Sequence, residues 1–184
     1  MRHRAAAVVL AVAVSACGSP SMPDSSQNPP APRGDVTIAF GTLIAQGAPV
    51  TTYAESGFTL APMFGGWIVS TSYGHPAPFI QFLAPAGTTV TGEIRVTAGG
   101  AAFAFKSIDV YSSTTRIPYT ITGLRQSATK LVIADTLPNT FGNFATIAGP
   151  SPPELIDMLV ILLSNSSAPC CQNPMGVDNI VLTR

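Results

Sequence analysis

Residues 102–113, AFAFKSIDVYSS, contain two apolar pairs that alternate out of phase with each other. Phe103 and Phe105 fall on odd positions, whereas Ile108 and Val110 fall on even positions. Because successive side chains of a strand point to opposite faces, a regular strand would separate these pairs. A β-bulge between them would keep all four in one core, and a strand buried on both faces is the alternative. Both interpretations predict a long strand in a sheet.

The rest of the chain follows the same pattern of short apolar segments, rich in β-branched and aromatic residues, between Gly and Pro. With 46% hydrophobic and 10% charged residues, 16 Gly and 17 Pro, the composition favours strands and turns. Residues 152–164, PPELIDMLVILLS, could begin a helix, but their Ile and Val favour a central strand buried on both faces. About ten or eleven strands in one domain predict an antiparallel β-sandwich or barrel.

The first 16 residues have the features of a secretory signal. MRHR is a positive n-region, and AAAVVLAVAV is apolar but too short to span a bilayer as a helix. VSAC then places small residues directly before Cys17, and this order resembles the lipobox of bacterial lipoproteins. The resemblance implies that Cys17 carries the lipid that anchors the mature chain in the cell envelope. Gly18 after the cysteine favours, by the same resemblance, the outer membrane of a Gram-negative cell. An ordinary signal peptide with a chance cysteine is the alternative.

Residues 17–34 are rich in Ser and Pro and have little to bury, so we expect a disordered tether. The sandwich domain is then expected over residues 35–184. Cleavage before Cys17 removes two arginines, which leaves seven basic against nine acidic residues. A mature net charge of about −2 without a basic run makes nucleic acid an improbable partner.

Several segments occur in a recognisable order: GGAAFAFKSIDVYSS, IPYTITGL, LVILLSN and GVDNIVL. This order resembles the jelly-roll domains of secreted bacterial proteins, including proteins with the PEP-CTERM sorting signal, and galactose-binding-like and carbohydrate-binding modules. The resemblance spans about residues 36–183 and implies a sandwich of jelly-roll type. The chain departs from the sorting-signal proteins because no C-terminal sorting helix follows.

Catalytic motifs are weak. His75 is the single histidine after residue 16, no nucleophile elbow marks a serine, and nothing pairs two carboxylates. A zinc site would need four suitably spaced ligands, which Cys170, Cys171 and His75 do not provide. We therefore predict that the protein is not an enzyme, with a hydrolase as the third choice among functions.

Cys170 and Cys171 are adjacent in a chain that is expected to be exported to an oxidising compartment. Adjacent Cα atoms lie about 3.80 Å apart, below the usual span of a disulfide. A bond between the two would be a strained small ring that stiffens its loop without joining distant strands. Two free thiols or an intermolecular bridge are the alternatives.

Asp178 lies in VDNIVL, where a regular strand would place it on the same face as Ile180 and Leu182. A carboxylate on a core face must be paired, hydrogen-bonded or bound to a metal. The carbohydrate-binding jelly rolls imply a structural calcium ion, held by Asp178 with an early partner, Glu55 or Asp35. The alternative is that Asp178 bonds to the backbone of the preceding loop.

Sugar binding needs exposed aromatic rings beside polar groups. Trp67, Tyr73 and His75 are the candidate contacts, although a large ring such as Trp67 also suits the core. We predict a membrane-anchored, extracytoplasmic, non-catalytic binding module for carbohydrate or another cell-envelope polymer. A structural or envelope-assembly lipoprotein without a small ligand is the alternative.

Overall fold

A computed structural model describes residues 34–71, 77–166 and 171–184, and the regular secondary structure of these residues is entirely β-strand. The strands are β1 (Asp35–Ile38), β2 (Tyr53–Glu55), β3 (Phe58–Phe64), β4 (Ile68–Ser70), β5 (Phe79–Ala84), β6 (Val90–Thr97), β7 (Phe103–Ser112), β8 (Ile117–Arg125), β9 (Ala128–Leu137), β10 (Ala145–Ala148), β11 (Leu155–Ile156), β12 (Met158–Asn165) and β13 (Asn173–Thr183). These 13 strands of the described residues exceed the ten or eleven expected from the sequence, and β2 and β11 are only three and two residues long.

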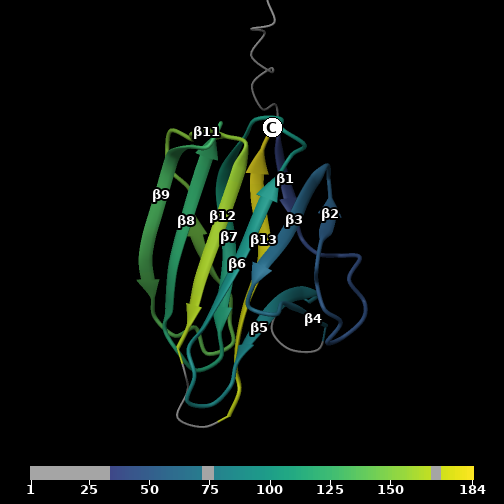
Figure 1. Ribbon diagram of the computed structural model, residues 1–184, viewed down its shortest axis with the longest axis vertical. Coiled ribbons are helices and arrows are strands. Elements are labelled where there is room, and N and C mark those ends of the chain that lie inside the picture. Colours follow the sequence, from purple (N-terminus) through teal and green to yellow (C-terminus); the bar gives the residue numbers. More distant parts are fainter. Residues whose placement is uncertain (1–33, 72–76, 167–170) are drawn as a thin grey trace, which may run out of the picture.

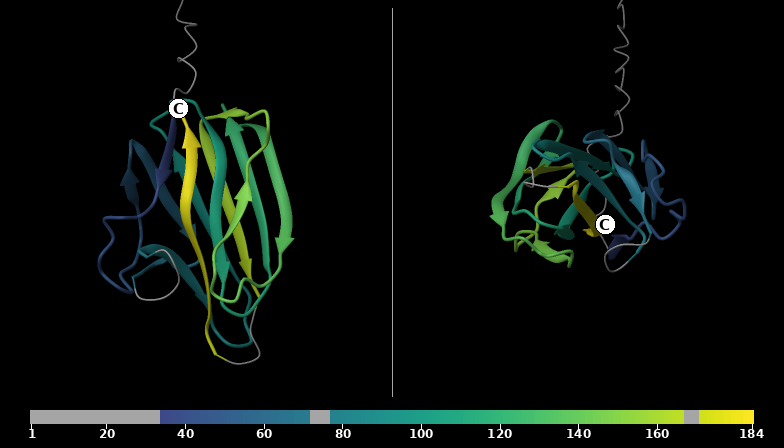
Figure 2. Two further views of the ribbon diagram at one scale, coloured as in Figure 1. Left: turned by 180° about the vertical axis from the view of Figure 1, so that it is seen from behind. Right: turned by 90° about the horizontal axis from the view of Figure 1, so that it is seen from below.

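Two antiparallel sheets pack face to face (Figures 1 and 2). One has the order β10-β7-β13-β5-β4, with β1 beside β13 and β11 beside β7, and the other has the order β2-β3-β6-β12-β8-β9. Strands β5, β13, β7 and β10 of one sheet and β6, β12, β8 and β9 of the other follow the connectivity of a jelly roll. The predicted fold class, an antiparallel β-sandwich of jelly-roll type, is confirmed.

The out-of-phase segment in β7 contains the predicted bulge. Phe103, Phe105, Ile108 and Val110 all belong to the core between the sheets. The pairing of β7 with β13 shifts so that Lys106 is an extra residue on β7. The bulge therefore keeps both apolar pairs on the inner face.

Strand β12 is central, between β6 and β8, but it is not fully buried on both faces as predicted. Leu159, Ile161 and Leu163 point inward with no exposed surface. The outward residues of the strand, from Met158 to Leu162, are only half-buried, because no third layer among the described residues covers this sheet.

Strand β13 begins at Asn173, so the segment NPMG, residues 173–176, is strand although Asn, Pro and Gly are typical of turns. Asn173 is fully buried, and its side-chain amide donates to Asn165 Oδ1 at 2.6 Å, which fixes the start of the strand. Gly176 is required because a Cβ there would collide with the ring of Tyr111. Packing thus extends the strand through residues that usually form turns.

The two ends of the described domain meet. Gly34 N donates to Arg184 O at 2.9 Å, and Arg184 N donates to Gly34 O at 3.0 Å. The C-terminus lies at the top of Figure 1, beyond the end of β13. Residues 34–71, 77–166 and 171–184 contain no helix with the length and hydrophobicity needed to cross a membrane.

Candidate functional site

The outward side of the six-stranded sheet, which we call the outer face, is at the front of Figure 1. Strand register aligns its side chains in rows that run across the strands. One row, from β3 to β9, consists of Phe64, Glu93, Leu162, Thr120 and Ala134. The next row consists of Ala61, Arg95, Val160, Thr122 and Val132. Four strand spacings of about 4.8 Å make each row about 19 Å long.

Phe64, Glu93 and Arg95, which we call the outer-face trio, occupy the β3 and β6 part of these rows. Phe64 is 57% exposed. Arg95 Nε donates to Glu93 Oε1 at 2.8 Å. Simple alternation from the inward Leu60 would also turn Phe64 inward, but the register shift between Pro62 and Phe64 turns it outward beside Glu93.

Within the trio, the carboxylate is shielded and the guanidinium is accessible. The side chain of Glu93 is 11% exposed and that of Arg95 is 42% exposed. A carboxylate this buried needs a charged partner, and Arg95 provides it. The Nη groups of Arg95 make no hydrogen bond to the described residues, so they can donate to a ligand.

An apolar hollow of about 300 Å³ adjoins Phe64, between the end of β3 and the start of β4. Its lining consists of Pro49, Val50, Thr51, Pro62, Met63, Phe64, Gly66, Trp67 and Ile68. Met63 is 46% exposed at its rim. The hollow therefore extends the apolar surface next to the exposed ring of Phe64.

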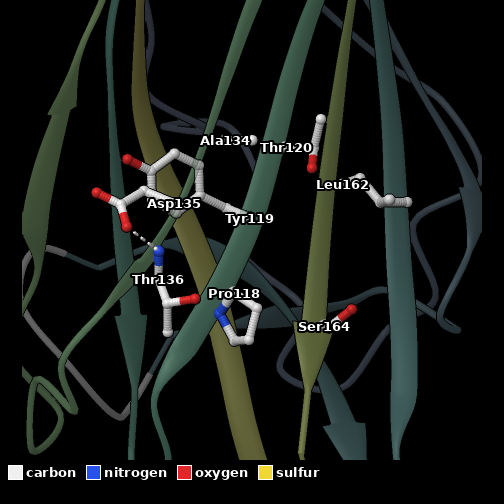
Figure 3. A pocket seen from close by; sticks show the side chains of 8 residues that line it. All are labelled: Pro118, Tyr119, Thr120, Ala134, Asp135, Thr136, Leu162 and Ser164. Carbon is white, nitrogen blue, oxygen red and sulfur yellow. Dashed lines mark hydrogen bonds between the residues drawn. The ribbon is translucent and has the colours of Figure 1, made fainter.

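A second hollow, of about 310 Å³, lies at the β8 and β9 end of the rows (Figure 3). Thr120, Leu162 and Ser164 project from the outward side of the sheet in this view, with Pro118 between the strands. Tyr119, which belongs to the core between the sheets, and its exposed partner on β9, Asp135, also line this hollow. The outward side of this hollow therefore offers hydroxyl and aliphatic groups to a ligand.

Tyr119 of β8 and Asp135 of β9 lie opposite each other in the strand pairing. Tyr119 is 9% exposed, and burial, together with the nearby charge of Asp135, raises the pKa of its phenol. Thr136 N donates to Asp135 Oδ1 at 2.7 Å, as Figure 3 shows. This pair marks the edge of the sandwich rather than the outer face.

Trp67 is not a surface contact, in contrast to its selection from the sequence as a candidate ligand-binding residue. It is 2% exposed, and its ring lies 4.7 Å from that of Phe82. Gly92 faces the indole, and a Cβ there would approach the ring to 2.8 Å. Core packing accounts for this ring, so it provides no platform for a sugar.

Asp178 is 1% exposed, but it does not share a face with Ile180 and Leu182 as predicted. Asn179 has a φ of 44° and forms a bulge, so Val177 and Ile180 both point into the core. Asp178 instead lies opposite Asp109 of β7, on the outward side of the seven-stranded sheet. The bulge reverses the alternation on which the prediction depended.

The environment of Asp178 disfavours its charge. Asn179 N donates to Asp178 Oδ1 at 2.8 Å. The pKa of Asp178 is raised to about 7, mainly by burial and also by the charges of Asp109 and Glu55. The hydrogen bond from Asn179 lowers this pKa but does not offset the increase. The alternative predicted from the sequence, a bond to the preceding loop, is replaced by this bond to the following residue.

The three predicted calcium ligands are not gathered at one point. Glu55 Oε2 accepts hydrogen bonds from Ala39 N at 2.9 Å and Phe40 N at 3.0 Å. Asp35 is exposed and accepts from Thr183 Oγ1 at 2.6 Å, at the C-terminal end of β13, whereas Asp178 is in the middle of that strand. The described residues contain no group of three or more acidic, Cys or His side chains suited to a metal ion.

Several predicted residues lie outside the described residues: Cys17, Tyr73, His75 and Cys170. Cys171 is described and exposed, with a φ of 71°. The lipid at Cys17, the ligand contacts of Tyr73 and His75, and the disulfide between Cys170 and Cys171 therefore stay predictions.

The outer-face trio was missed as a site. The alternation in TGEIRVT places Glu93 and Arg95 on one side of a strand, and this signal was readable from the sequence. The outward position of Phe64 depends on a bulge that the sequence does not indicate.

Comparison with known proteins gives no assignment by sequence. No family model matches the chain, and no curated protein matches it.

Comparison with solved structures returns carbohydrate-binding modules at low similarity. A family 29 carbohydrate-binding module is 14% identical, with 82% of this chain and 91% of that chain covered and a TM-score of 0.44. The CBM32 of AlyQ, in complex with 4,5-unsaturated mannuronic acid, is 10% identical, with 66% and 95% covered and a TM-score of 0.38. A Ruminococcus gnavus GH29 fucosidase is 10% identical, with 67% and 25% covered and a TM-score of 0.43. These values do not assign the chain to any of these families.

Proposed function

We propose that this protein is a non-catalytic carbohydrate-binding module that holds a glycan chain across the outer face. The observation that carries the proposal is the exposed ring of Phe64 beside the Glu93–Arg95 ion pair. The C–H groups of a sugar ring can pack on an aromatic face, while a guanidinium donates hydrogen bonds to its oxygens. The outward hydroxyls of Thr120 and Ser164 continue this mixed surface toward β9.

A binding role suits the acidic groups better than a hydrolytic one. Asp109 and Asp178 lie opposite each other on β7 and β13, and glycoside hydrolysis requires a pair of carboxyl groups. However, Asp178 is 1% exposed. Both oxygens of Asp109 are engaged, by Thr146 Oγ1 at 2.6 Å and Asn179 Nδ2 at 3.0 Å. A substrate would have to displace these bonds to reach the pair.

A binding screen with the domain from residue 34 tests the proposal, using soluble glycans and insoluble cell-wall polymers. We expect retention by at least one glycan, and a loss of about tenfold or more in affinity for Phe64→Ala and for Glu93→Gln. Phe141→Ala is the matched control, because Phe141 is 79% exposed but lies in the loop between β9 and β10. Binding that survives both outer-face substitutions would contradict the assigned site.

The alternative is a structural or envelope-assembly lipoprotein without a small ligand. The burial of Trp67 favours it, because the single tryptophan is used in the core rather than on a binding surface. A complete absence of glycan retention in the screen would support this alternative.

We also propose that Cys17 carries a lipid that anchors the protein in the bacterial cell envelope, with the outer membrane favoured in a Gram-negative cell. The support is the order of n-region, apolar stretch and lipobox in the first 17 residues. A tether that reaches the domain at Gly34 would join one end of the sandwich, whereas the outer face is on its side. Cys17→Ser should release the protein from membranes, and retention of this variant would contradict the anchor.

A further inference from the structure

We propose that the outer-face trio selects glycans that carry a carboxylate, and that Arg95 binds this carboxylate. The chemical class is a uronic-acid-containing oligosaccharide or polymer. This inference rests on the proposed carbohydrate-binding function, and it concerns the same face.

Arg95 is held in position before any ligand arrives. Its Nε donates to Glu93 Oε1 at 2.8 Å, which fixes the plane of the guanidinium relative to the sheet. The Nη groups, which make no hydrogen bond to the described residues, form the remaining edge of the fork. A planar fork of this kind matches the two oxygens of a carboxylate. Because the ion pair already restricts the side chain, less conformational entropy is lost when a ligand binds.

A ligand at this point meets positive rather than negative charge. The side chain of Arg95 is 42% exposed, whereas that of Glu93 is 11% exposed. The ion pair is neutral as a whole, but its solvent-facing part is the guanidinium. A neutral sugar would use only hydrogen bonds here, whereas a carboxylate would add a charge-assisted pair.

The neighbours of Arg95 strengthen such a pair. Register places Ala61 on one side of Arg95 and Val160 on the other. Neither side chain competes for the Nη hydrogen atoms, and the small Ala61 leaves space above the sheet. Charge-assisted hydrogen bonds beside aliphatic groups are less weakened by water than those in an open polar surface.

Phe64 provides the second contact of the same sugar unit. It pairs with Glu93 and is therefore diagonal to Arg95 across β3 and β6. Diagonal neighbours in an antiparallel pair are separated by about 7–8 Å. A sugar ring stacked on Phe64 can thus direct its carboxyl substituent toward Arg95, which couples recognition of the ring to recognition of the charge.

The test compares acidic glycans with their carboxyl-reduced counterparts, which keep the backbone and lose the charge. The panel contains polygalacturonate, alginate and a glucuronic-acid polymer, each in both forms, together with neutral mannan and galactan. We expect at least one acidic glycan to bind about 10- to 100-fold more tightly than its reduced form, with a preference that weakens as salt is added.

Arg95→Gln should abolish this preference, so that the acidic and carboxyl-reduced forms bind equally. Arg95→Lys should recover only part of it, because an ammonium lacks the planar fork. Lys130→Gln is the matched control, since it removes a cation from the edge strand β9 instead.

Each outcome of this comparison has a distinct meaning. Equal binding of acidic and reduced forms, or an acidic preference that survives Arg95→Gln, would overturn the carboxylate assignment and leave carbohydrate binding intact. No binding to any member of the panel or to the neutral polymers would overturn the proposed function itself.

Discussion

Replacement of Asp178 by asparagine should stabilise the protein, and the gain should depend on pH. The carboxyl group is 1% exposed, and its pKa in the folded protein is raised from 3.8 to about 7. Burial is the largest cause, and the nearby charges of Asp109 and Glu55 act in the same direction. Folding must therefore remove a charge from water or keep a proton on the group.

The sign and size of the effect follow from this pKa. Below about pH 4 the carboxyl group is protonated in both states, so it adds no pH-dependent term. Between about pH 4 and pH 7 only the unfolded chain releases the proton, so stability falls as pH rises. Above about pH 7 both states are charged, and a shift of about three pH units at about 1.4 kcal/mol each costs about 4 kcal/mol.

Urea denaturation at a series of values from about pH 4 to about pH 8, with chelator present, measures this term. Asp178→Asn keeps an oxygen that can accept from Asn179 N, and it cannot ionise. We expect the variant to gain on the order of 4 kcal/mol over the wild type near pH 8 and almost nothing near pH 4. Asp135→Asn is the control, because Asp135 is exposed on another strand. A difference between Asp178→Asn and wild type that stays constant across this range would refute the reasoning.

Three further outcomes are expected. Glu55→Gln should lower the free energy of unfolding by about 1.5–3 kcal/mol in urea titrations, because the carboxylate accepts from two backbone amides; an unchanged midpoint would contradict this role. Gly176→Ala should cost about 1–3 kcal/mol because its Cβ meets the ring of Tyr111, whereas Gly41→Ala, with nothing within 4 Å, should be tolerated; equal melting temperatures for the two variants would count against the clash. If calcium binds at Asp178, the melting temperature near pH 8 should be higher with calcium than with chelator, and Asp178→Asn should remove the difference; equal wild-type values would reject the ion.

The fold class was predictable because the alternation of apolar residues that indicates a strand lies within a few neighbouring residues of the sequence. Alternation and Gly or Pro punctuation predicted about ten or eleven strands in an antiparallel sandwich or barrel, and the phase shift in β7 predicted a bulge that the structure contains. Such patterns survive because each inward residue must contact the core whatever the topology is. The order of strands in the two sheets is not local, and it was inferred through resemblance to jelly rolls rather than from periodicity.

The candidate site was predicted poorly for a physical reason that two residues share. Asp178 directly precedes Asn179 in β13, and Phe64 directly follows Met63 in β3. Asn179 and Met63 each interrupt the regular pairing of their strand. A single inserted residue reverses which face every later side chain occupies, so alternation predicted the wrong face for Asp178 and would place Phe64 inward. The bulge in β7 was detectable because apolar residues flank it on both sides and must all be buried. The bulge in β3 is followed only by residues at the surface, where burial imposes no constraint that a sequence could reveal. Surfaces built next to bulges will therefore escape pattern analysis more often than the cores beneath them, and the proposed binding surface of Phe64, Glu93 and Arg95 is an example.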